Sequence, residues 1–381
     1  MIDLAPDLPA ILALTERSVA IDSGTYCTQG VQRVIDLWAD HLAQSGFATT
    51  QSPLEHRANQ LTATKTFGNG QRILVLGHAD TVWPEGTVAT WPFHNDGAFL
   101  TGPGVGDMKT NVVMALHALR RLAANPPQGI GQITILIVPD EEIGSPGSRA
   151  WIESHARQSD ACLTLEPCRP GGKLVTGRGA VGALYLKARG ISAHVGPARH
   201  LGASAISALA ALIAPLEALT DDNLGIGASV GIFRGGAARQ VVPDEAELHL
   251  DLRATTQAAA DHLMTELTRI TTQKPTDPRV TITTEGGFYR PPFPTTPGTQ
   301  RLYALAQQIG AGLKIQIDQV TSPGGSDGSF AAALGIPTLD GIGPICHESC
   351  SRRERVELDS IIPHANLFAR LIDAIGQHGA A

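Results

Sequence analysis

Histidine and carboxylate residues follow short apolar segments at several points of the chain, where they could gather into one site. They are His78, Asp80, Asp107, Glu141, Glu142, Glu166 and His347. The apolar run 73–76 directly precedes His78 and Asp80, and the mostly apolar segment 133–138 precedes Glu141 and Glu142. Because open α/β sheets keep their sites at the carboxyl ends of the strands, these side chains can converge there.

Each of these residues also has an ordinary explanation when it is taken alone. His78 and His347 could be solvated histidines of a turn or loop, and Asp107 could cap the helix that follows it. Taken together, imidazole and carboxylate groups without thiolates are typical of a hydrolytic metal site with open positions for water. Two imidazoles and three carboxylates can hold two metal ions if one carboxylate bridges them. A further carboxylate can then act as general base toward the attacking water.

Amphipathic helical spacing and short apolar runs alternate in the two outer parts of the chain, which must position these residues. Helical spacing occurs in 18–45 and 111–124, strands are expected at 73–76 and 133–139, and the alternation returns at 299–310, 335–339 and 361–375. This pattern predicts an α/β domain whose mostly parallel sheet has helices on both faces.

The middle of the chain has a different pattern, typical of an α+β domain with an antiparallel sheet. Strands are expected at 183–188, 245–253 and 279–284, and helices at 203–220 and 256–272. We therefore predict an inserted domain, 178–286, that interrupts a catalytic domain formed by 1–177 and 287–381. The glycine pattern at 177–182 precedes a strand rather than a helix, which argues against a dinucleotide site.

Composition and charge exclude several classes of protein. The chain has 381 residues, 43% of them hydrophobic, and a net charge of −7 without a basic run. A nucleic-acid partner is therefore not expected, since such proteins normally present a basic surface. The longest apolar run, 208–214, is far shorter than the ~20 residues of a membrane span, and the acidic N-terminus does not resemble a secretory signal. Five cysteines suit neither a disulfide framework nor a thiolate zinc site, so we predict a soluble, cytoplasmic protein.

The order of the motifs resembles that of the M20 metallopeptidases, and most of all their glutamate carboxypeptidase (carboxypeptidase G) branch. The matching segments are His78-x-Asp80, Gly106-Asp107-Met108-Lys109, Asp140-Glu141-Glu142-x-Gly144-Ser145, Glu166-Pro167, Ser192-Ala193-His194, Gly324-Gly325-Ser326-Asp327 and His347. The resemblance covers essentially the whole chain, including the inserted domain, which corresponds to a lid that mediates dimerisation.

The resemblance implies a role for each residue of the metal centre. Asp107 would bridge two zinc ions, for which cobalt or manganese could substitute. The remaining ligands would be His78 and Glu166 for one ion, and Glu142 and His347 for the other. Glu141 would be the general base, and Asp80 would orient the ring of His78. The resemblance further implies a cis peptide bond between Asp107 and Met108.

The resemblance also implies a substrate-binding set. Arg290, in the segment 288–293, and Arg253 match arginines that hold a substrate carboxylate, although either could be an ion-paired surface residue. Lys173 resembles a lysine associated with an acidic substrate side chain, or is an exposed loop lysine. His194, on the inserted domain, would reach the site of the neighbouring subunit in a homodimer. Gly325 and Ser326 complete the set.

Several positions depart from the family pattern. Gln240 stands in place of an asparagine, Thr110-Asn111 replaces two glycines, and the segment 346–354 is longer than usual. Cys168 and Cys350 either lie near the site or serve as small packing residues. These departures are compatible with the metal centre but weaken the inference about the substrate.

The expected activity is that of a di-zinc amidohydrolase. It would release a C-terminal amino acid, which we expect to be acidic, from a small peptide or an N-acyl amino acid. The alternative on the same scaffold is an N-acyl amino-acid deacetylase or deacylase of the acetylornithine or succinyl-diaminopimelate type. A non-catalytic binding protein that retains the fold is a third possibility.

Overall fold

The computed structural model describes residues 3–380 and divides the chain into two compact units. The first unit comprises Met1–Gly177, Phe293–Ser322 and Ser326–Ala381, and the second comprises Arg178–Pro292 and Pro323–Gly325. The second unit extends beyond the expected boundary at residue 286, because the strand β14 (Thr281–Arg290) continues through that position.

The first unit is built on a six-stranded sheet with the strand order β1-β2-β6-β3-β7-β16. The strands are β1 (Ala48–Ser52), β2 (Gln60–Thr66), β3 (Gln71–His78), β6 (Ile130–Val138), β7 (Ala161–Thr164) and β16 (Thr338–Leu339). The pairs β3–β6, β3–β7 and β7–β16 are parallel, whereas β1–β2 and β2–β6 are antiparallel. The predicted, mostly parallel sheet is therefore confirmed, with an antiparallel edge that the sequence pattern did not predict.

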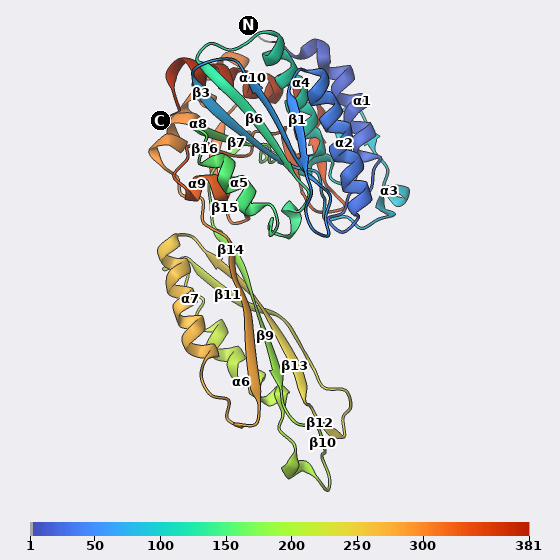
Figure 1. Ribbon diagram of the computed structural model, residues 1–381, viewed down its shortest axis with the longest axis vertical. Coiled ribbons are helices and arrows are strands. Elements are labelled where there is room, and N and C mark those ends of the chain that lie inside the picture. Colours follow the sequence, from blue (N-terminus) through green and yellow to red (C-terminus); the bar gives the residue numbers. More distant parts are fainter. Residues whose placement is uncertain (1–2, 381) are drawn as a thin grey trace. The chain divides into compact units, whose positions relative to one another are not determined.

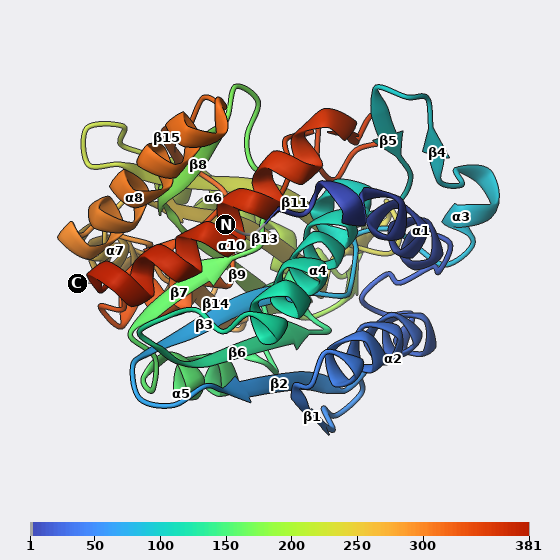
Figure 2. The ribbon, with the colours of Figure 1, turned by 90° about the horizontal axis from the view of Figure 1, so that it is seen from above.

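Helices cover both faces of this sheet, as predicted (Figures 1 and 2). In β3, Ile73 and Val75 belong to the larger hydrophobic core, while Leu74 and Leu76 belong to a second core on the opposite face, as the period of two in a strand requires. The larger core contains residues of α1 (Leu8–Val19), α2 (Thr28–Gln44), α4 (Thr110–Ala124), α8 (Pro297–Leu313) and α10 (Ile361–His378). The second core contains residues of α5 (Arg149–Ala156) and α9 (Gly328–Ala333).

Smaller elements complete the first unit. A four-stranded sheet has the order β17-β18-β5-β4, and β15 pairs with β8. These elements are α3 (Thr87–Thr90), β4 (His94–Asn95), β5 (Phe99–Thr101), β8 (Lys173–Arg178), β15 (Asp318–Ser322), β17 (Cys346–His347) and β18 (Arg355–Glu357).

The segment 18–45, which contains helical spacing, is not one helix. Helix α1 ends at Val19 and α2 begins at Thr28. The intervening residues run beside the segment that follows β3, where Thr81 N donates to Ser23 O at 2.9 Å and Thr25 N donates to Thr81 O at 3.2 Å. This interruption brings Thr25 next to the predicted site residue Asp80.

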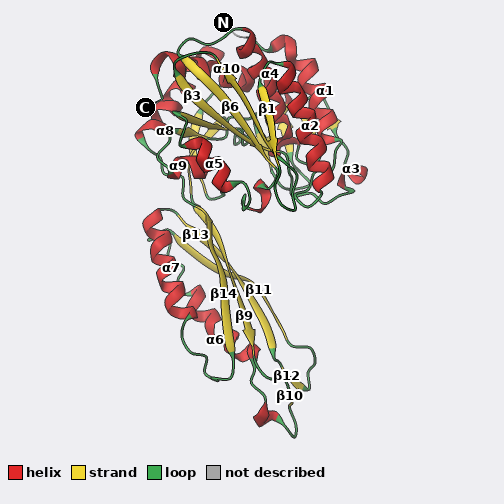
Figure 3. Ribbon diagram, viewed as in Figure 1, coloured by secondary structure: helices red, strands yellow, loops and turns green. Residues whose placement is uncertain are grey.

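The second unit has the antiparallel sheet and two helices that the sequence pattern predicts (Figure 3). The strand order is β11-β13-β9-β14, and every neighbouring pair is antiparallel. Its elements are β9 (Ala180–Arg189), β10 (Ala193–His194), α6 (Ala205–Glu217), β11 (Ile226–Gly235), β12 (Val241–Val242), β13 (Glu245–Ala254) and α7 (Gln257–Thr271), together with β14. Residues of both helices pack with Leu248, Leu250 and Leu252 of β13 in one core.

Candidate metal centre

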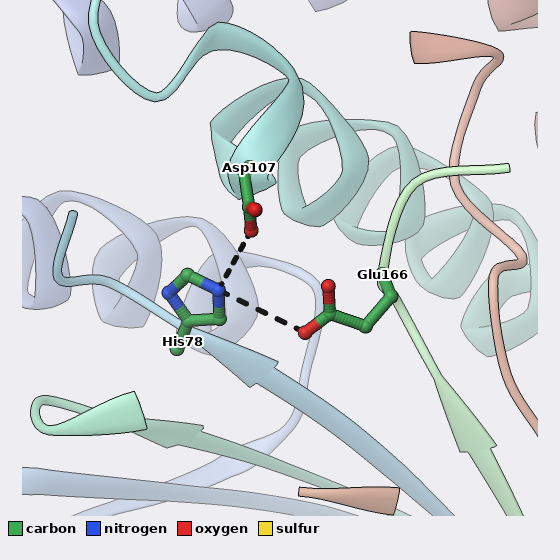
Figure 4. A group of neighbouring side chains, drawn as sticks. All are labelled: His78, Asp107 and Glu166. Atoms are coloured by element: carbon green, nitrogen blue, oxygen red, sulfur yellow. Dashed lines mark hydrogen bonds and ion pairs between the residues drawn. The ribbon is translucent and has the colours of Figure 1, made fainter. Parts of the chain in front are cut away.

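His78 is the last residue of β3, and its ring is buried with only 1% of its surface exposed. Nδ1 lies 2.9 Å from the backbone oxygen of Asp80. Because a carbonyl oxygen can only accept, Nδ1 carries the proton of this hydrogen bond. Nε2 then faces Asp107 Oδ1 at 3.2 Å and Glu166 Oε1 at 4.0 Å. In Figure 4 the three side chains point toward one another, an arrangement that suits one metal ion.

Asp107 belongs to two groups of metal-type side chains. The first is His78, Asp107 and Glu166, and the second is Asp107, Glu142 and Cys350. Within each group the ligand atoms lie within 4.8 Å of one another. One carboxylate shared by two groups is the arrangement expected of a residue that bridges two ions.

The loop that carries Asp107 has an unusual backbone. The peptide bond between Asp107 and Met108 is cis, as predicted from the family resemblance. Helix α4 begins at Thr110 and has no side-chain cap, so the explanation of Asp107 as a helix cap is wrong. The side chain is instead directed to His78 and Cys350, whose Sγ donates to Asp107 Oδ2 at 3.3 Å.

Asp80 holds the two glutamates that follow β6. Its carboxylate accepts hydrogen bonds from the backbone N–H groups of Glu141 at 3.1 Å and Glu142 at 3.2 Å, and from the hydroxyl of Thr25 at 2.7 Å. Asp80 Oδ1 also lies 3.5 Å from His78 Nδ1. This side chain therefore connects the ends of β3 and β6, and it fixes both the imidazole and the start of the glutamate pair.

The carboxylates of the site outnumber its cationic groups. Burial and the charge of Asp107 raise the pKa of Glu142 and of Glu166 well above the ordinary glutamate value. Burial alone would lower the pKa of His78, but hydrogen bonds to Asp107 and Asp80 raise it well above the usual imidazole value. Glu142 Oε1 is buried and has no hydrogen-bond partner among the described residues. A divalent cation would compensate this charge and satisfy the unpaired oxygen, so the donor set fits a metal.

The structure does not bring His347 into either group. Its Nε2 lies 2.7 Å from Glu357 Oε1, and its ring contacts Phe99 edge-on with the centroids 6.1 Å apart. Of the two cysteines considered from the sequence, Cys350 lies at the site, whereas Cys168 is buried in the larger core.

Glu354 and Asn111 support the metal-type residues and were not identified from the sequence. Glu354 Oε1 accepts from the backbone N–H groups of Gly106 at 2.7 Å and Asp107 at 3.1 Å. Asn111 Nδ2 donates to Gly106 O and to Leu165 O, both at 2.8 Å, and so connects the loop of Asp107 to the segment that ends in Glu166. Glu354 stands in a charged run that resembles a solvated surface, which is why its sequence context gives no sign of this role.

The predicted substrate-binding residues of the first unit have different environments. The hydroxyl of Ser326 is buried and donates to Asp340 Oδ2 at 2.6 Å. Lys173 is exposed at the start of β8. Next to Glu142 lies a surface pocket of about 480 Å³, whose lining includes Tyr26, Val82 and Trp83.

The second unit contains the remaining predicted substrate-binding residues. Arg253 makes two hydrogen bonds to Asp251, at 2.7 and 3.1 Å. Arg290 is buried, and a Cβ added to Gly325 would lie 2.4 Å from Arg290 Cδ, so the glycine permits close packing against this arginine. Gly196 N donates to His194 Nδ1 at 3.0 Å, which places the proton of a neutral ring on Nε2.

The site is a buried group of imidazole and carboxylate side chains at the strand ends of an α/β sheet, a donor set typical of metal-dependent hydrolases. Residues 74–374 match the model of peptidase family M20/M25/M40. The chain belongs to this family, as the motif order predicted. It is therefore a hydrolase of the peptidase and amidohydrolase type, and its family is metal-dependent.

Two relatives of known function have different activities. The chain is 29% identical over 377 residues to carboxypeptidase G2 from Pseudomonas sp. (strain RS-16), covering 97% of this chain and 90% of that protein. It is 31% identical over 387 residues to succinyl-diaminopimelate desuccinylase from Xanthomonas campestris pv. campestris (strain 8004), covering 96% and 98%.

Solved structures share the fold. Aminopeptidase PepT from Bacillus cereus ATCC 10987 has a TM-score of 0.77 at 20% identity, covering 97% of this chain and 98% of that one. The M20 family metallo-carboxypeptidase Sso-CP2 from Sulfolobus solfataricus has a TM-score of 0.73 at 16% identity, covering 96% and 99%. Among residues 3–380, no helix is both long and apolar enough to cross a membrane.

Proposed function

We propose that the protein is a di-zinc amidohydrolase that releases a C-terminal, acidic amino acid from a small peptide or an N-acyl amino acid. The observation that carries this proposal is the presence of two groups of ligand side chains that share Asp107. The similarity to carboxypeptidase G2 over nearly the whole chain favours this type of substrate. We propose further that the protein acts in the cytoplasm as a homodimer.

The ligands divide between two positions. His78, Asp107 and Glu166 would hold the first ion, and Asp107, Glu142 and one more side chain from the segment 346–354 would hold the second. When bound, two zinc ions polarise the scissile carbonyl group and make the attacking water more acidic. Cobalt or manganese could occupy the same ligands.

The side chains of the protein would perform the proton transfer and the orientation of the substrate. Glu141 is 91% buried and its backbone is fixed by Asp80. We assign it as the general base that takes a proton from the attacking water and returns it to the leaving amine as the amide C–N bond breaks. Arg290 and Arg253 are the candidates for binding the substrate carboxylate, since a guanidinium group can make two parallel hydrogen bonds to it. Lys173 would contact an acidic side chain, and Gly325 and Ser326 would also contribute to substrate binding.

His194 has a proposed role in the homodimer. Its Nδ1 accepts from Gly196 N, so Nε2–H is free to donate. We propose that this N–H stabilises the oxyanion that develops on the substrate in the partner subunit.

The second candidate is an N-acyl amino-acid deacylase, which is favoured by the 31% identity to a succinyl-diaminopimelate desuccinylase. Assays of the zinc-loaded protein on two sets of substrates separate the candidates. One set has C-terminal glutamate or aspartate on peptides and aromatic acyl groups, with leucine as the comparison. The other consists of N-succinyl-diaminopimelate and N-acetylornithine. We expect the acidic C-terminal substrates to have the highest kcat/KM, and faster hydrolysis of the second set would establish the deacylase instead.

Variants of the arginines test the mode of binding. Arg290→Gln should raise KM for substrates with a free α-carboxylate, and it should leave the zinc content unchanged. Arg189→Gln is a suitable control, because Arg189 is an exposed residue of the second unit whose nearest ionic partner is Glu245 at 3.9 Å. An unchanged KM in Arg290→Gln would contradict the assignment.

A further inference from the structure

The loop between β17 and β18 places a thiol where an imidazole is expected. Cys350 Sγ lies 3.3 Å from Asp107 Oδ2, and it forms a group of potential ligands with Asp107 and Glu142. His347 lies outside this group, with its Nε2 directed to Glu357 Oε1. The segment that contains both residues is longer than the family pattern, so a residue further along the chain can occupy the position next to Asp107.

The backbone of this loop is held in place around Cys350. Cys350 N donates to Glu354 Oε2 at 3.1 Å, while the other oxygen of the same carboxylate binds the backbone of Gly106 and Asp107. One buried carboxylate therefore connects the backbone of Cys350 directly to the backbone of Asp107. Cys350 has a φ of +61° and Glu348 a φ of +53°. This left-handed conformation is uncommon for residues with a side chain, so the surrounding contacts must maintain it.

Glu142, a member of the same group, has an unsatisfied oxygen. Glu142 Oε1 is inaccessible to solvent and has no hydrogen-bond partner among residues 3–380. A buried carboxylate oxygen normally has a partner. The thiol of Cys350, a carboxylate oxygen of Asp107 and a carboxylate oxygen of Glu142 together provide three ligand atoms for one cation.

We propose that Cys350, rather than His347, is the third protein ligand of the second metal position, beside Asp107 and Glu142. The inference rests on the proposed two-metal centre and specifies its composition. On metal binding the S–H bond is replaced by a bond from sulfur to the metal, and the proton passes to solvent. His347 then acts as a structural residue that pairs with Glu357 and packs on Phe99. A thiolate ligand suits zinc and cobalt better than manganese or magnesium, so the second position should prefer the first two ions.

Titration of the metal-free protein with Co²⁺ tests this ligand directly, because a bond between a thiolate and Co²⁺ gives a strong charge-transfer absorption in the near ultraviolet. Carboxylate and imidazole ligands do not give this band. We expect the wild-type protein to bind two cobalt ions per chain and to develop the band with one of them. Cys27→Ser is the matched control, since Cys27 is the other cysteine that is not buried, and this variant should keep the band.

Substitutions at the two competing positions complete the test. Cys350→Ser should lose the band and bind one of the two cobalt ions at least about tenfold more weakly. His347→Gln should keep both the band and the two ions. Cys350→His should recover the second ion without the band. This recovery would show that the serine variant loses the ion because it lacks a ligand at position 350.

The possible failures are distinguishable. Two cobalt ions bound without a charge-transfer band in the wild type would overturn the assignment of Cys350 and leave the proposed function intact. If His347→Gln lost the second ion and Cys350→Ser kept it, the assignment of Cys350 would also be overturned. His347 would then be the ligand, and the proposed function would stand. Fewer than two ions in the wild type would overturn the two-metal centre itself.

Discussion

Replacement of Asp80 by asparagine changes the site without removing any proposed metal ligand. The two oxygens of Asp80 accept hydrogen bonds from Thr25 Oγ1, Glu141 N and Glu142 N. Asparagine has nearly the same shape but only one oxygen, and its NH₂ group can only donate. One of the two backbone N–H groups therefore loses its acceptor, whichever way the amide is oriented.

The cost of the change follows from these contacts. If the amide turns its NH₂ group toward Thr25, the hydroxyl of Thr25 can rotate and accept a hydrogen bond from it. In this orientation the backbone N–H of Glu142 is the single donor left without a partner. An unsatisfied, buried N–H costs about 1–3 kcal/mol. The N–H belongs to a proposed ligand, and the change also removes a negative charge 3.5 Å from His78 Nδ1. We therefore expect a decrease of about 10–100-fold in zinc affinity, the usual effect of changing a group that orients a metal ligand.

Competition with a chromophoric chelator measures this affinity. Urea unfolding of the metal-free protein measures the stability cost separately. Asp160→Asn is the matched control: Asp160 Oδ2 accepts from a single backbone N–H, that of Arg72 at 2.8 Å, at an exposed position. If Asp80→Asn bound zinc as tightly as the wild type, the positioning role assigned to Asp80 would be refuted.

Four further predictions concern the mechanism, the metal, the assembly and the stability. Glu141→Gln should lower turnover by about 10²–10⁴ with both metal ions retained, whereas Glu142→Gln should lose metal as well; near-native turnover of the first variant would exclude Glu141 as the base. Removal of metal with a chelator should abolish hydrolysis, and zinc or cobalt should restore it, so that activity persisting in metal-free protein would contradict the mechanism. Random reassociation of inactive His194→Ala and Glu141→Ala subunits should recover about a quarter of the wild-type activity, because half the dimers are mixed and each has one intact site; no recovery is expected if His194 acts within its own subunit. Asp7→Asn should destabilise the fold by about 1.5–3 kcal/mol in urea unfolding near pH 7, since Asp7 is buried and bound by Arg121 at 2.7 and 2.8 Å. Burial alone would raise the pKa of Asp7, but Arg121 and Arg120 lower it below 3.8. The stabilisation by this ion pair is therefore present above pH 3.8 and is lost as the pH falls through the pKa of Asp7 in the folded state. If Asp7→Asn destabilised the fold equally below that pKa, the ion pair would be refuted as the cause.

The sequence alone predicts the sheet of the first unit and much of its site. Apolar runs at β3 and β6 identify buried strands, and a strand has a period of two, so the residues that follow them leave the sheet at a known edge. That edge brings His78 and Asp80 close to Glu141 and Glu142. The alternation in 245–253 likewise identifies β13 as a half-buried strand of the second unit. The strands can be predicted because the apolar pattern and the strand that it indicates span the same few residues.

Contacts between distant segments are decided only by the tertiary structure. The antiparallel edge β1–β2, the break between α1 and α2 that delivers Thr25 to Asp80, and the support of Asp107 by Glu354 have no local signature. The same is true of the loop geometry on which the proposed choice between His347 and Cys350 as a metal ligand rests. These residues are three positions apart in one irregular loop, and no periodicity fixes the direction of loop side chains. Their orientation depends on the backbone N–H that Glu354 accepts from Cys350 and on the pairing of His347 with Glu357, contacts that exist only once the strands around the loop have assembled.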